Sequence, residues 1–131
     1  MTASPHIQLA QQLLRIGNTG GAIEQLRRAL SVAPDDAFAH ALLALCLNDT
    51  RRLHAAAHEA KLALSLAPEM PVAHLVAGIV ATNRHHFRAA EEHLTQARAL
   101  APGDSNVLRW LARLYRATGR HKLAGATLQE A

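Results

Sequence analysis

The chain has 131 residues, 50% of them hydrophobic, and a formal net charge of +4 from 14 Lys and Arg against 10 Asp and Glu. This length suits one domain, and the apolar fraction excludes an intrinsically disordered protein. The basic residues are spread over most of the chain, so the charge balance indicates nucleic-acid or membrane binding only weakly.

Targeting signals and cysteine chemistry add little. The segment 1–10 lacks the basic and apolar regions of a signal peptide, and no apolar run reaches the ~20 residues of a membrane span. The single cysteine, Cys46, lies in the apolar run 41–47, which favours a small buried side chain over a reactive thiol. We therefore expect a cytoplasmic chain without membrane insertion. The sequence leaves open whether a further domain or a membrane anchor follows residue 131.

A repeat of 34 residues organises the chain. Ala-Pro pairs recur at Ala33-Pro34, Ala67-Pro68 and Ala101-Pro102. At the same spacing, small residues align in two columns, which hold Ala10, Ala44, Gly78 and Ala112, and Ala22, Ala56, Ala90 and Ala124. Such a period indicates a repeat architecture. The sequence predicts one domain, 3–131, made of repeats 3–36, 37–70, 71–104 and an incomplete 105–131.

Each repeat has the apolar spacing of two helices. In the first repeat, Leu9, Leu13 and Ile16 follow one helical face, and Ile23 begins a second one. Turn-forming and polar residues separate the helices of successive repeats at 17–21, 48–50, 83–86 and 118–120. Proline ends each second helix, and Ser4, Asp36, Asp104 and Ser105 are candidate caps.

The small-residue columns predict close helix contacts. Helices approach to ~8 Å only where the side chains between them are small, so Gly78 and the alanines are expected at the crossing points. One helix pair cannot bury both of its apolar faces, so successive pairs should stack. His6, His40 and His74 recur at the repeat spacing, and we expect neutral rings hydrogen-bonded between the helices.

The aligned pattern resembles the tetratricopeptide repeat (TPR) family. The last repeat has the motif residues Leu108, Leu111, Ala112, Tyr115, Ala124 and Leu128. The histidines at motif position 4, and Arg98 where Leu30 and Leu64 stand in other repeats, depart from the motif. The resemblance implies an all-α, right-handed solenoid of about four antiparallel helix pairs that acts as a non-enzymatic protein-binding scaffold.

The resemblance also implies a concave groove lined by the first helix of each repeat. On this chain the groove residues are Phe38, Ala41, Leu45, Val72, Leu75 and Ile79, followed by Arg109, Trp110, Arg113 and Arg116. The three arginines have i, i+4, i+7 spacing, and guanidinium groups bind carboxylates in bidentate fashion. We expect a partner peptide or helix with an apolar stretch beside acidic groups or a free carboxylate. Alternatively, the arginines form a solvated face and Trp110 packs against the rest of its repeat.

Other functions have less support in the sequence. No motif of a hydrolase, nucleotide-binding or metalloprotease site is present, so neither catalysis nor a cofactor is predicted. His54 and His58 have the i, i+4 spacing of metal ligands, but no further pattern completes a metal site. Self-association through a terminal face around Leu123 and Leu128 is the main alternative. An RNA-reading repeat is disfavoured because aromatic residues for base stacking are scarce.

Overall fold

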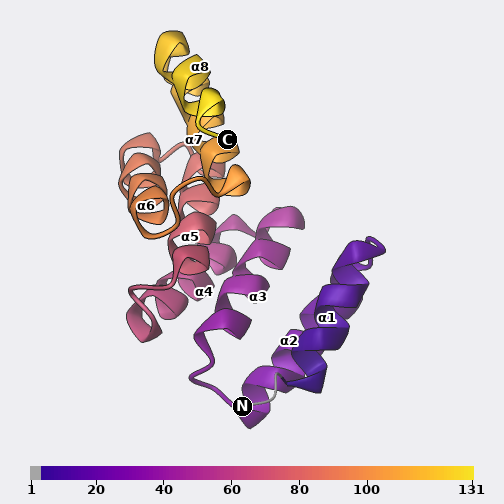
Figure 1. The fold of residues 1–131 in the computed structure, drawn as a ribbon. Coiled ribbons are helices and arrows are strands. Elements are labelled where there is room, and N and C mark those ends of the chain that lie inside the picture. Colours follow the sequence, from indigo (N-terminus) through magenta and orange to yellow (C-terminus); the bar gives the residue numbers. More distant parts are fainter. Residues whose placement is uncertain (1–3) are drawn as a thin grey trace. The chain divides into compact units, whose positions relative to one another are not determined.

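The computed structural model describes residues 4–131, which form eight α-helices. In chain order these are α1 (Pro5–Arg15), α2 (Thr19–Val32), α3 (Ala37–Asp49), α4 (Leu53–Leu66), α5 (Pro71–Asn83), α6 (Phe87–Leu100), α7 (Ser105–Ala117) and α8 (His121–Gln129) (Figure 1). They pack as antiparallel pairs, which confirms the all-α fold of about four repeats. The predicted domain start at residue 3 lies outside the described residues, and the right-handed winding stays a prediction.

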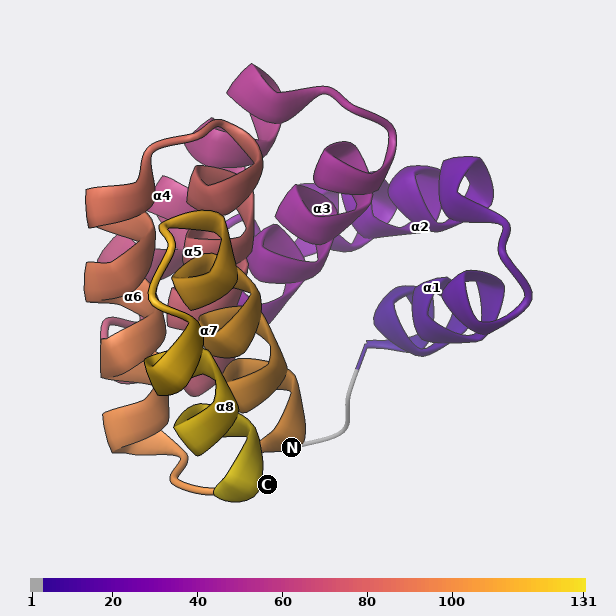
Figure 2. The same ribbon diagram turned by 90° about the horizontal axis from the view of Figure 1, so that it is seen from above.

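Contacts between helices divide the chain into two units. Unit 1, Met1–Pro68, contains α1 to α4, and unit 2, Glu69–Ala131, contains α5 to α8. In unit 1, α1 runs beside α2 in both Figure 1 and Figure 2, α3 packs on α2, and α4 packs on α3. In unit 2, α5 packs on α6, α7 on α6, and α8 on α7. Each unit therefore holds two of the four helix pairs.

The small-residue columns lie at the helix contacts as predicted. Ala10, Ala44 and Ala112 are buried, and so are all four alanines of the second column. Gly78 shows why size matters, because a Cβ atom built there would lie 2.5 Å from the side chain of Leu94. Leu94 is fully buried and fills the space that the glycine leaves open. Cys46 is also buried, and burial raises the pKa of its thiol to about 11, consistent with the predicted inert side chain.

Within each pair, a three-residue turn joins the two helices. The middle residue of each turn has a positive φ, and these residues are Gly17, Arg51, His85 and Gly119. In the first turn, the N–H of Gly17 donates to the carbonyl of Leu14, and the N–H of Asn18 donates to that of Leu13. The same two hydrogen bonds recur in the other three turns. This is the Schellman motif, which satisfies the last carbonyl groups of the first helix.

Two of the four turns, 16–18 and 84–86, are narrower than residue type predicted, and a third, 50–52, lies two residues later than predicted. Thr19, Gly20 and Gly21 belong to the first turn of α2, because the side chain of Asn18 accepts a hydrogen bond from the N–H of Gly21 at 2.9 Å and caps the helix. The segments 48–49 and 83 belong to the ends of α3 and α5. Only the break at 118–120 has the predicted bounds.

Two of the four predicted caps form capping hydrogen bonds. Asp36 accepts from the N–H of Ala39 at 3.1 Å, and Asp104 caps α7. Ser4 occupies the cap position of α1, with Pro5 next to it, but its side chain makes no capping hydrogen bond. Ser105 is the first residue of α7 rather than its cap. The alanines of the three Ala-Pro pairs lie outside the helical region, with φ of −132° to −142° and ψ of 72° to 81°, because the following proline ring disfavours a helical residue before it.

Candidate functional site

Helix α7 has one buried and one exposed face. Its start is fixed by Asp104, whose carboxylate accepts hydrogen bonds from the N–H groups of Asn106 at 2.9 Å and Val107 at 3.2 Å. The buried face consists of Val107, Leu108, Leu111, Ala112, Leu114 and Tyr115. Because these residues turn inward at helical spacing, the remaining face of α7 is exposed to solvent.

The three predicted arginines lie on this exposed face. Arg109, Arg113 and Arg116 are all exposed, and none forms an ion pair with a carboxylate among residues 4–131. The guanidinium of Arg113 lies over the indole ring of Trp110, 4.9 Å from the ring centroid. Trp110 is half-buried against the core of unit 2. The cation–π contact orients one guanidinium, and the three positive charges remain available to an anion.

A shallow cavity of about 280 Å³ joins the arginines to apolar surface. Its lining consists of Arg109, Trp110, Ala112, Arg113, Arg116 and Leu128. Leu128 comes from α8 and is 38% exposed. From the sequence, Leu128 was expected on a terminal apolar face. It lies beside the arginines because α8 packs on α7, a contact that the sequence pattern does not show. We call these six residues the arginine face.

The predicted apolar groove residues differ in their accessibility. Ala41 is 0% exposed and Ile79 is 5% exposed, so both side chains contribute mainly to packing. The other four, Phe38, Leu45, Val72 and Leu75, are half-buried. In unit 2, Leu75 also packs against the hydrophobic core. The side chains of the predicted apolar groove are thus more buried than the three arginines.

The recurring histidines each face a residue 19 positions later in the paired helix. The Nδ1 atom of His6 lies 2.9 Å from the Gln25 side-chain oxygen, and that of His40 lies 2.6 Å from a Glu59 carboxylate oxygen. In the third repeat, the rings of His74 and His93 lie 6.0 Å apart. The predicted location between helices is therefore confirmed.

The predicted neutral state does not suit His40. Its Nε2 atom lies 2.8 Å from the carbonyl oxygen of Pro34, so acceptors face both ring nitrogens. Burial alone lowers the pKa of His40, but the hydrogen bonds to Glu59 and Pro34 and the charges of Glu59 and Asp36 outweigh burial and raise it. The arrangement therefore favours the protonated ring.

The other histidine pattern brings no metal ligands together. His54 and His58 are both exposed on α4. In the part of the chain that the structure describes, no group of three or more His, Cys, Asp or Glu side chains is placed to hold a metal ion. Within the same residues, no helix combines the length and apolar character needed to cross a membrane.

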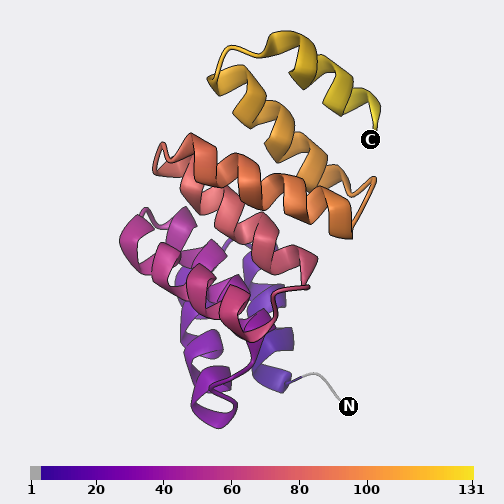
Figure 3. The same ribbon diagram turned by 90° about the vertical axis from the view of Figure 1, so that its left-hand side faces the viewer.

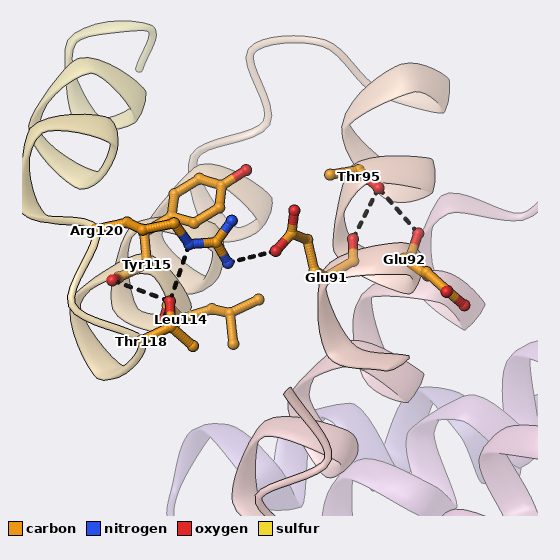
Figure 4. A network of polar contacts seen from close by, with 7 residues as sticks. All are labelled: Glu91, Glu92, Thr95, Leu114, Tyr115, Thr118 and Arg120. Carbon is orange, nitrogen blue, oxygen red and sulfur yellow. Dashed lines mark hydrogen bonds and ion pairs between the residues drawn. The ribbon is translucent and has the colours of Figure 1, made fainter. Parts of the chain in front are cut away.

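A polar network that the sequence pattern did not predict connects the α7–α8 turn to α6 (Figure 4). The guanidinium of Arg120 lies over the ring of Tyr115, 4.8 Å from its centroid, and forms an ion pair with Glu91. Arg120 also donates to the Thr118 hydroxyl at 3.2 Å. The hydrogen bond from Arg120 lowers the pKa of Glu91, because it favours the ionised carboxylate. With an ion pair between Arg98 of α6 and Glu130, which follows α8, this network links both ends of α8 to α6.

Several solved bacterial proteins have a similar fold. TTC0263, a thermophilic TPR protein of Thermus thermophilus, has a TM-score of 0.87 at 19% identity, over 95% of this chain and 70% of that one. MamA from Desulfovibrio magneticus RS-1 has a TM-score of 0.79 at 17% identity, over 96% and 71%. For PilF of Pseudomonas aeruginosa the TM-score is 0.83 at 26% identity, over 95% and 59%. These similarities show the fold.

Family models identify the repeat itself. No curated protein matches the sequence. Two models, both described as tetratricopeptide repeat, match residues 3–46 and 81–131. Together the two matches cover more than half of the chain. The structure also has the antiparallel helix pairs that the resemblance to this family predicted. The chain therefore belongs to the tetratricopeptide repeat family.

Proposed function

We propose that the chain is a non-enzymatic binding module whose arginine face holds an acidic segment of a partner protein. TPR domains generally mediate protein–protein interaction and are typically non-catalytic. The observation that supports the finer proposal is the exposed set of Arg109, Arg113 and Arg116, which have no carboxylate partner in the described chain and lie beside Trp110. Arginine and tryptophan are the residues most enriched at energetic centres of interfaces.

The chemistry of the arginine face defines the partner segment. Guanidinium groups at i, i+4, i+7 spacing match carboxylates that recur along one side of a helix or an extended peptide. Trp110 and Leu128 supply apolar surface in the same cavity. We therefore infer a segment that combines aspartate, glutamate or a free C-terminal carboxylate with one bulky apolar residue.

Peptide selection tests this proposal and does not require an identified partner. Random peptides displayed on phage are selected on the full chain, and the enriched peptides are synthesised with free and with amidated C-termini. Their affinity is then measured by fluorescence anisotropy for the wild type, for Arg113→Glu and for Arg27→Glu. Arg27 is an exposed arginine of α2 in unit 1, so its reversal makes the same charge change outside the arginine face.

The expected result is enrichment of acidic peptides with an apolar residue. Arg113→Glu should weaken their binding by about tenfold or more, because an attractive charge pair becomes repulsive, whereas Arg27→Glu should change it less than about twofold. Far-UV circular dichroism checks that both variants keep their helicity. Enrichment of peptides without acidic residues, or equal affinity of the wild type and Arg113→Glu, would remove the arginine face from the model.

Self-association is the second candidate function. Leu123 and Leu128 of α8 are 43% and 38% exposed, and an exposed apolar helix face favours contact with another protein surface. Light scattering over a range of concentrations distinguishes the two functions. A molar mass that stays at that of one chain at every concentration excludes self-association. A molar mass that increases with concentration in the wild type, but not in Leu123→Glu, supports it.

A further inference from the structure

Unit 2 carries opposite charges at the two ends of its helices. Because its helix pairs are antiparallel, the α5–α6 and α7–α8 turns lie at one end and the α6–α7 turn lies at the other. Figure 3 shows the first two turns on the left and the third on the right. The α6–α7 turn, 101–104, has one acidic residue, Asp104, and no basic residue. The two other turns are rich in basic side chains.

The basic side chains form a surface that we call the basic edge. It consists of Arg84, His85, His86, Arg88, His121 and Lys122. Arg84 is half-buried and the other five are exposed. None of the six takes part in an ion pair within residues 4–131. Arg120 lies in the same turn, but it is paired with Glu91 and is therefore left out.

Apolar side chains flank the basic edge. Leu123 follows Lys122 directly and is 43% exposed. Phe87 is half-buried against the core of unit 2, and its ring meets His85 edge-on at 5.5 Å. Glu92, in the following turn of α6, is exposed and lies in a cavity with Arg88. The edge thus combines an excess of positive charge with one exposed leucine.

We propose that the basic edge binds the anionic headgroups of a lipid surface. Basic residues near an anionic membrane are attracted to its surface potential, and a neighbouring apolar side chain adds contact with the interface. A planar surface can touch the tips of both turns at once, because these turns lie at the same end of unit 2. This binding would lie outside the arginine face and would leave that face free.

Two other anionic occupants fit the basic edge less well. Single-stranded nucleic acid is commonly bound by bases stacking on exposed aromatic side chains, and Phe87, which lies between His86 and Arg88 in the chain, packs against the core. A second copy of the chain has the same formal net charge of +4, which disfavours its approach to a basic surface. The pattern recurs independently in unit 1, where the α3–α4 turn carries Arg51 and Arg52 and the α2–α3 turn carries Asp35 and Asp36.

Vesicle binding by the full chain tests the proposal. Vesicles of phosphatidylcholine alone, and of phosphatidylcholine with phosphatidylserine, are incubated with the protein and separated by flotation. The test variant is Arg84→Glu with Arg88→Glu and Lys122→Glu. The control variant reverses Arg15, Arg27 and Lys61, which are exposed basic residues outside both the basic edge and the arginine face. Circular dichroism and thermal unfolding establish that both variants fold, and Gln replaces Glu if the test variant does not.

We expect binding to the phosphatidylserine vesicles only, with a loss of about tenfold or more in the test variant and a smaller loss in the control. Binding should also weaken at high salt. Equal binding to both vesicle types, or equal losses in the two variants, would overturn the proposal. No vesicle binding together with salt-dependent retention of RNA would overturn it in favour of nucleic acid. The variants of the peptide experiment, Arg113→Glu and Arg27→Glu, do not alter the basic edge. Lipid binding at the basic edge and peptide binding at the arginine face can therefore be disproved independently.

Discussion

One turn position is strained in half of the repeats. It holds Gly17 and Gly119, with φ of 84° and 79°, and Arg51 and His85, with φ of 64° and 60°. A side chain with a Cβ atom adopts this left-handed conformation at a cost of about 1–2 kcal/mol. Arg51 and His85 therefore occupy a site where the hydrogen bonds of the Schellman motif favour glycine. Residue type alone did not reveal this position, because only two of its four occupants are glycine.

Glycine should stabilise the strained turns. We expect Arg51→Gly and His85→Gly each to raise the free energy of unfolding by about 0.5–1 kcal/mol, because the relief of strain exceeds the added entropy of the unfolded chain. Arg51→Ala is the matched control, since it removes the charge but keeps the Cβ atom. Urea unfolding followed by circular dichroism measures the change. A gain in Arg51→Ala equal to that in Arg51→Gly would show that charge, and not backbone strain, is responsible.

At the scale of helices, the histidine positions show how one repeat site takes different partners. His6 meets Gln25, His40 meets Glu59 and His74 meets His93, while the fourth repeat has Leu108 and Thr127, which are both buried. Burial, followed by the charge of His74, lowers the pKa of His93, whereas the Glu59 carboxylate reverses the effect of burial at His40. The constant separation of 19 residues was present in the sequence and would have predicted these pairs.

The His40–Glu59 pair should make stability depend on pH. The folded-state pKa of His40 is raised, so its contribution is fully present below the unfolded value of about 6.5 and is lost as the pH rises through the folded value. Glu59→Gln should remove this dependence, because it leaves a neutral amide like the His6–Gln25 pair. We also expect it to lower the free energy of unfolding by about 1–3 kcal/mol near pH 6.

This prediction is tested by measuring the free energy of chemical unfolding of the wild type and of Glu59→Gln at several pH values. The difference in unfolding free energy between them should shrink as the pH rises above neutrality. Other titrating groups act on both proteins and cancel in the difference. A difference that stays constant, or that grows with rising pH, would contradict a protonated His40.

At the scale of the whole molecule, the repeat spacing predicted the helix pairs but not every contact between them. The alanine columns and Gly78 were enough to locate the crossing points, because small residues are required where helices meet closely. Leu128 was not assigned to the arginine face, because its neighbours depend on how α8 packs on α7. The ion pair between Glu91 and Arg120 was missed for the same reason, since it joins residues on different repeats. The predicted turn bounds were wrong where a polar residue belongs to the end of a helix. Asn48, for example, was assigned to a turn by residue type but lies buried in the last turn of α3.

The central claim is that an acidic partner segment binds at the arginine face, and NMR mapping tests it most directly. Isotope-labelled protein is titrated with a selected acidic peptide, and shifts are followed at the indole N–H of Trp110 and the side-chain Nε–H groups of Arg109, Arg113 and Arg116. The account predicts that these signals, with backbone amides of α7 and of α8 near Leu128, shift together and saturate. Shifts confined to other helices, with the Trp110 and arginine side-chain signals unchanged at saturation, would contradict it.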